Sequence, residues 1–185
     1  YCRSLASVSL GKRVTVIGNY AFKECVSLTG VQIPGSVTSW GAGVFGNCRS
    51  LASATIDSGV TSIGDGAFSN CTSLVSLRIP DTVTSIGSGA FAICKSLTNV
   101  LIPDRVTSIS AGLFTGCTGL NNVGIHDRVA TIGDGAFRAC TGLTGLTLPN
   151  SLTSIGEGAF WECAGLMGIA LPSSVTSIGR WAFRD

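Results

Sequence analysis

The sequence predicts a solenoid, a fold in which short, similar coils stack along one axis. Its eight cysteines recur every 23 residues from Cys2 to Cys163, and its eight phenylalanines recur every 23 residues from Phe22 to Phe183. Eight such repeats account for the chain apart from Tyr1. One repeat is too short to bury its own apolar side chains, so neighbouring repeats must cover them and equivalent residues must stack in columns.

The first half of each repeat predicts a short β-strand. Counted from the cysteine as position 1, position 4 is always Leu, and positions 7 and 9 are apolar. Residues two apart lie on the same side of a strand, so positions 7 and 9 should face the core while positions 6 and 8 face outward.

The second half of each repeat predicts another apolar segment and a turn. Positions 13 and 16 are apolar, as in Val83 and Ile86, and position 17 is Gly in every repeat but one, where Ser110 replaces it. A Gly that recurs there indicates a backbone with positive φ or a close approach of two backbone segments. We expect the Ala and Phe that follow, as in Ala90 and Phe91, to close the coil inward.

The repeat reads approximately C-t-s-L-t-s-V-x-I-P-d-s-V-T-S-I-G-d-G-A-F, and the stretch from Leu74 to Cys94 is a close example. This pattern resembles the leucine-rich repeats of the BspA-like, Treponema pallidum type. The resemblance implies a leucine-rich-repeat solenoid, α/β or mainly β, with eight 23-residue repeats in a right-handed coil and a parallel sheet on its concave face. It also implies a secreted or cell-surface protein that acts in adhesion and binds surface or matrix proteins, without catalysis.

The repeats predict a single leucine-rich-repeat array over residues 1–185, with no linker or second domain. Neither end carries the polar cap that a repeat array needs, so we expect the array to be a segment of a longer protein. The repeats begin at Cys2, Cys25, Cys48, Cys71, Cys94, Cys117, Cys140 and Cys163.

Composition argues against two classes of partner. The net charge is +2 and only 12% of the residues are charged, scattered along the chain. Nucleic-acid binding needs a concentrated basic face, so we expect no nucleic-acid partner. Gly, Ser, Thr or a charged residue interrupts every apolar run before the roughly 18 residues of a membrane helix, so we expect no membrane insertion.

The cysteines predict a column of buried, unpaired thiols. No Cys-x-x-Cys motif is present, and side chains stacked about 4.8 Å apart exceed the usual disulfide Cβ separation of about 3.5–4.5 Å. Disulfides between some pairs remain the alternative. The single histidine, His126, rules out a two-histidine metal site and suits a turn better than catalysis. We therefore expect no enzyme, catalytic residue, metal or cofactor.

A charged column follows the first strand of the middle repeats. It contains Asp81, Asp104 and Asp127 beside Arg105 and Arg128. Turn propensity and ion pairs between neighbouring repeats explain this column more simply than calcium binding.

Outward positions of the first strand are the candidate partner site, because packing does not constrain them. The predicted site is Gln32, Thr55, Arg78 and Leu101 with Asn99 and Asn122. Trp161, Trp181 and Arg180 form a second candidate, for docking at the end of the array. The leading hypothesis is a protein-interaction or adhesion module of a secreted or surface protein. The alternative is a structural subunit or scaffold that packs through its ends in a larger assembly, which could be intracellular.

Overall fold

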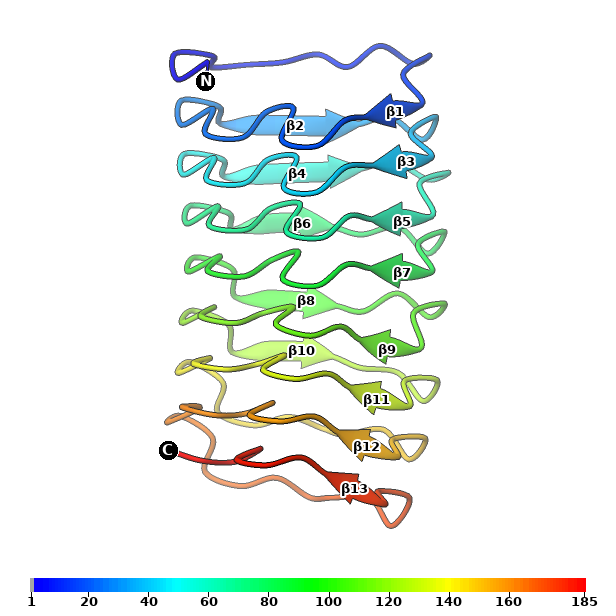
Figure 1. Ribbon diagram of the computed structural model, residues 1–185, viewed down its shortest axis with the longest axis vertical. Coiled ribbons are helices and arrows are strands. Elements are labelled where there is room, and N and C mark those ends of the chain that lie inside the picture. The colour runs from blue at the N-terminus through cyan, green and yellow to red at the C-terminus, as the bar shows by residue number, and fades with distance from the viewer. Residues whose placement is uncertain (1) are drawn as a thin grey trace.

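The computed structural model describes residues 2–185 as one stack of coils, with each repeat forming one coil (Figure 1). Tyr1, the first residue of the predicted array, lies outside the described residues. Each coil has a first strand, a turn, a second strand and a third side built from turns. Strands are the regular elements of residues 2–185, so the fold is the mainly β form of the predicted solenoid. This part of the chain contains no helix long and apolar enough to cross a membrane.

The strands pair in parallel with the equivalent strands of neighbouring coils, in the register that a 23-residue repeat requires. Val31 of one coil lies opposite Ala54 of the next, and Ala54 lies opposite Leu77. The first strands are β2 (Gly30–Ile33), β4 (Ser53–Ile56), β6 (Ser76–Arg78), β8 (Asn99–Leu101) and β10 (Asn122–Gly124). The second strands are β1 (Val16–Ile17), β3 (Ser39–Trp40), β5 (Ser62–Ile63), β7 (Ser85–Ile86), β9 (Ser108–Ile109), β11 (Thr131–Ile132), β12 (Ser154–Ile155) and β13 (Ser177–Ile178).

The core consists of columns of identical side chains. The eight phenylalanines stack face to face along the axis, with successive ring centroids 5.2–5.9 Å apart. The rings from Phe45 to Phe160 are fully buried, as are the leucines of position 4 from Leu28 to Leu143. Burying large aromatic and aliphatic side chains supplies most of the stabilisation that a coil cannot obtain alone.

The predicted column of buried thiols is present. All eight cysteines are free; Cys2 is exposed and the other seven are buried. Each thiol from Cys48 onward donates a hydrogen bond to a phenylalanine carbonyl of the neighbouring turn, as Cys117 Sγ does to the carbonyl of Phe91 at 3.0 Å. Burial disfavours the thiolate and raises the pKa of Cys48 and Cys117 to about 12.

The glycines of position 17 lie where two coils come closest. A Cβ added to Gly87 would lie 2.4 Å from the backbone nitrogen of Asp65 in the previous coil, which no real Cβ tolerates. The Gly87 N–H donates across the same gap to the carbonyl of Ile63 at 2.8 Å. Positive φ occurs instead at position 19, as in Gly66 with φ of 58°. Close approach, and not positive φ, is therefore the reason for Gly at position 17.

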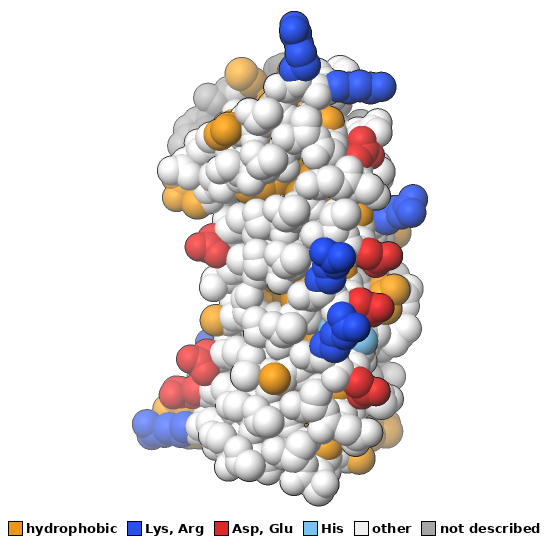
Figure 2. Space-filling view, turned by 90° about the vertical axis from the view of Figure 1, so that its right-hand side faces the viewer, with side chains coloured by type: hydrophobic (Ala, Val, Ile, Leu, Met, Phe, Trp, Pro, Cys, Tyr) orange, Lys and Arg blue, Asp and Glu red, His pale blue; other side chains and the backbone are white. Residues whose placement is uncertain are grey.

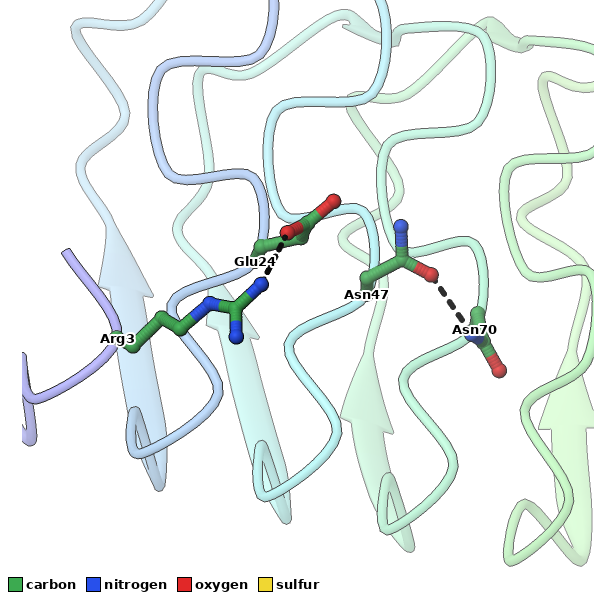
Figure 3. Close-up of polar contacts among 4 residues, drawn as sticks. All are labelled: Arg3, Glu24, Asn47 and Asn70. Atoms are coloured by element: carbon green, nitrogen blue, oxygen red, sulfur yellow. Dashed lines mark hydrogen bonds and ion pairs between the residues drawn. The ribbon is translucent and has the colours of Figure 1, made fainter. Parts of the chain in front are cut away.

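The third side joins the coils through backbone hydrogen bonds and a few side-chain contacts. The Phe45 N–H donates to the carbonyl of Ala67 at 2.8 Å, and this bond recurs along the stack. At the last position of neighbouring coils, Asn70 Nδ2 donates to Asn47 Oδ1 at 2.7 Å (Figure 3). Arg3 and Glu24 pair at 3.4 Å between the first two coils in the same view.

Candidate interaction surface

The structure places the six residues of the predicted partner site on one face. Gln32, Thr55 and Arg78 lie side by side on β2, β4 and β6, and Asn99 lies opposite Asn122 on β8 and β10. All of them are exposed, as is Leu101, because alternate residues of each strand point away from the core. We call this surface the first-strand face.

Gln32 has a partner that the sequence did not reveal. Its side-chain Nε2 donates to both carboxylate oxygens of Asp57, each at 3.1 Å. Asp57 occupies a position where most repeats have Pro. The amide of Gln32 is therefore held toward the turn, and a ligand there meets the pair as one polar unit.

A groove of 510 Å³ opens on the first-strand face beside Arg78 and Leu101. Leu101 is 74% exposed, an unusual environment for a Leu in the middle of a sheet face. The groove is also lined by Leu77, Ile79 and Arg105. These three residues were not among the predicted site residues, because positions 7 and 9 were expected to be buried.

The charged column lies along the turns between the first and second strands (Figure 2). Its turns form as predicted, but the expected ion pairs between coils are wrong. In residues 2–185 the ion pairs within 4.0 Å are Arg3 with Glu24 and Arg138 with Glu162. Successive column members point into solvent, where water screens their attraction. One carboxylate instead caps a turn, since Asp127 Oδ1 accepts the N–H of Asn150 at 3.3 Å.

His126 has a structural place in its turn. Its Nε2 lies 2.9 Å from the carbonyl of Pro103 in the previous coil. Its Nδ1 accepts the backbone N–H of Arg128 at 3.2 Å. The ring is half-buried, and with Nε2 as the protonated nitrogen it replaces the Pro of other repeats by linking two turns.

The predicted end-docking residues lie together on the third side of the last coils. The rings of Trp161 and Trp181 are 5.7 Å apart and tilted by 54°. The guanidinium of Arg180 lies 3.9 Å from the ring centre of Trp181, and that of Arg138 lies 4.0 Å from the ring centre of Trp161. The sequence identified three of these residues but not Arg138, which comes from the preceding coil. Guanidinium groups cover the indole faces, and such contacts stabilise by about 0.5–1 kcal/mol each when exposed.

No group of three or more His, Cys, Asp or Glu side chains in residues 2–185 is arranged to hold a metal ion. The buried thiols point into the phenylalanine carbonyls, and the carboxylates of the charged column point outward along one edge. The chemistry of the exposed surface is therefore that of polar, apolar and guanidinium contacts.

Solved structures of similar chains come from bacteria. A leucine rich cell surface protein from Faecalibacterium prausnitzii is 39% identical, with a TM-score of 0.79 over 93% of this chain and 46% of that one. A leucine-rich repeat protein from Eubacterium ventriosum is 32% identical, with a TM-score of 0.78 over 92% of this chain and 45% of that one. A leucine rich repeat protein from T. pallidum is 30% identical, with a TM-score of 0.61 over 90% of this chain and 67% of that one.

The chain spans less than half the length of the first two of these proteins. None of the curated proteins with which it was compared is similar to it. The sequence profile of the BspA type leucine rich repeat region matches six copies, over residues 1–121 and 62–185. With the repeat, the mainly β solenoid and these similarities, the chain belongs to the BspA-type leucine-rich repeat family.

Proposed function

We propose that this chain is a non-catalytic protein-interaction module of a secreted or cell-surface protein, and that it acts in adhesion through its first-strand face. The family and the similarity to a leucine rich cell surface protein support the location and the class of function. Fold alone does not define a partner, so the binding site must come from the surface residues.

The exposed row of Gln32, Thr55 and Arg78, continued by Leu101, carries the proposal. It combines small polar residues with one exposed aliphatic side chain and one guanidinium that has no carboxylate within 4.0 Å in residues 2–185. Aliphatic and Arg side chains on an otherwise small, polar surface suit a broad contact with another protein.

The test is the binding of the purified chain to a panel of immobilised extracellular-matrix proteins and mucins. The double variant Gln32→Glu, Arg78→Glu should bind at least about tenfold more weakly, since a loss of about 1.4 kcal/mol is tenfold in affinity. Its melting temperature should stay unchanged because both residues are exposed. A matched variant, Ser85→Glu with Ser108→Glu, adds acidic charge to the second strands and should bind like the parent chain.

Equal binding by the two double variants would contradict the assignment of the first-strand face. Absence of binding to every protein of the panel would contradict the interaction function itself.

A second candidate is a structural subunit that packs through the end of the stack. The last coil exposes an apolar surface, and another coil or another subunit would bury it. Its exposed side chains are Met167, Leu171, Ile178 and Phe183. The intact mass of the protein from its source distinguishes the two functions. A mass well above 18.8 kDa supports a module within a longer array, and a mass near 18.8 kDa with stable association supports the subunit.

A further inference from the structure

Strand pairing is interrupted between the fourth coil, residues 71–93, and the fifth coil, residues 94–116. The first strands form one sheet of β2, β4 and β6 and another of β8 and β10. The second strands are interrupted at the same place, between β7 and β9. Figure 1 shows β6 and β8 farther apart than β4 and β6. We call this interruption the seam.

The third side stays continuous across the seam. The Phe91 N–H donates to the carbonyl of Leu113 at 3.1 Å, and the Ile93 N–H donates to that of Thr115 at 2.7 Å. The rings of Phe91 and Phe114 stack with centroids 5.9 Å apart. The two coils are therefore joined along the third side and separated along their strands.

Ser110 explains the seam. It replaces the Gly of position 17, and at the other repeats a Cβ there would lie within 2.2–2.7 Å of the previous coil wherever such a coil is present. Ser110 has a Cβ, so its coil cannot approach the previous coil as closely. Its hydroxyl donates to the carbonyl of Ile86, which replaces the backbone bond that Gly87 makes to Ile63.

The seam produces the groove on the first-strand face. Leu77 and Ile79 are only half-buried, whereas the equivalent Ala54 and Ile56 of the third coil are buried. With Leu101 they give the groove an apolar floor. The separation of β6 from β8 thus uncovers core side chains in the middle of the array, where both neighbouring coils are present.

The rim of the groove is basic. Arg78 and Arg105 line it together with the single acid Asp81. Neither guanidinium lies within 4.0 Å of a carboxylate in residues 2–185. A guanidinium binds a carboxylate through two parallel hydrogen bonds, so an anionic group above this floor would find the donors unoccupied.

We propose that the seam groove binds a short segment of a partner protein that presents an aliphatic side chain beside a carboxylate. The aliphatic side chain lies on Leu77, Ile79 and Leu101, and the carboxylate lies between Arg78 and Arg105. This inference rests on the proposed function, because it names the chemistry of the partner that the first-strand face takes.

The experiment is an NMR titration of the ¹⁵N-labelled chain with a blocked dipeptide, N-acetyl-leucyl-glutamate amide. Its controls are the glycyl-glutamate peptide, which lacks the aliphatic group, and the leucyl-lysine peptide, which reverses the charge. We expect saturable shifts of the amides of Arg78, Leu101 and Arg105 with the first peptide and at least tenfold weaker binding of the other two. Absent shifts, or shifts spread over the surface without saturation, would overturn the inference.

Variants test the link between the groove and the seam. Ser110→Gly should let the coils close, weaken dipeptide binding at least tenfold and raise the melting temperature. Ser88→Gly makes the same change on the third side and should leave dipeptide affinity unchanged. Arg105→Glu should abolish binding without closing the seam, so the inference stays testable if Ser110→Gly disturbs folding. Unchanged affinity in Arg105→Glu would refute it.

The outcomes separate the two proposals. Dipeptide binding at the seam with no binding to any protein of the panel would uphold the groove and contradict the adhesion function. Protein binding that is lost in the Gln32→Glu, Arg78→Glu variant but unaffected by Ser110→Gly and Arg105→Glu would uphold the function and refute the groove.

Discussion

Gly156→Ala should lower the free energy of unfolding by about 4 kcal/mol. The added Cβ would lie 2.5 Å from the backbone nitrogen of Asp134, so the two coils must separate. Separation breaks the bond from the Gly156 N–H to the carbonyl of Ile132 and the bond from the Glu157 N–H to Asp134 Oδ1, both 2.7 Å long. Two such bonds contribute about 2 kcal/mol, and the steric displacement costs about as much.

The control for this variant is Gly168→Ala, because an added Cβ there meets no atom within 4 Å. The φ of Gly168 also lies outside the positive region, so Ala there should be neutral or stabilise by up to about 1 kcal/mol. Urea unfolding followed by circular dichroism gives both values, and Gly156→Ala should lower the melting temperature by about 10 °C. Equal stability of the two variants would refute the close-approach explanation of position 17.

Three further predictions concern single departures from the repeat and the thiol column. The Nε1–H of Trp40 is buried without a hydrogen-bond partner in residues 2–185, so Trp40→Phe should stabilise by about 1 kcal/mol, and a lower urea midpoint would contradict this. Ile93 is 38% exposed and has φ of 60°, so Ile93→Asn should raise the melting temperature by about 2–4 °C in calorimetry, and no rise would argue against backbone strain there. The pKa of Cys48 and Cys117 rises from the usual 9.0 to about 12 on folding, so their stabilisation is intact below pH 9. Above pH 9 it should fall by about 1.4 kcal/mol per pH unit for each thiol, and urea midpoints that stay constant to pH 11 would contradict their burial.

The repeat period made most of the fold predictable. An interval of 23 residues that holds for every Cys and Phe leaves one way to stack the coils, and alternation along the first strand then places Arg78 and Leu101 outward. The predicted partner site was therefore found as one exposed face, because strand alternation depends only on local spacing. Its function as a binding site remains a proposal.

Contacts between coils were harder to predict, because they depend on distances that the repeat pattern does not contain. Ser110 was visible as a departure, yet its effect on β7 and β9 follows from a clearance of 2.2–2.7 Å that only the structure supplies. The ion pairs predicted for the charged column failed for the same reason, since stacking alone does not orient long exposed side chains. Positive φ at Ile93 was equally unpredictable, because a β-branched residue disfavours that conformation.

The identity of the stacked columns has a consequence for how the chain folds. Each coil presents the same Leu, Phe and Cys to its neighbours, so a coil stacked on the wrong neighbour, with one repeat looped out, would bury nearly the same core. Contacts that exist between only one pair of coils distinguish the correct order from such misaligned stacks. The Asn47–Asn70 bond and the Arg138–Trp161 contact are of this kind. The irregular residues of the array thus give its otherwise interchangeable coils an order in which to assemble.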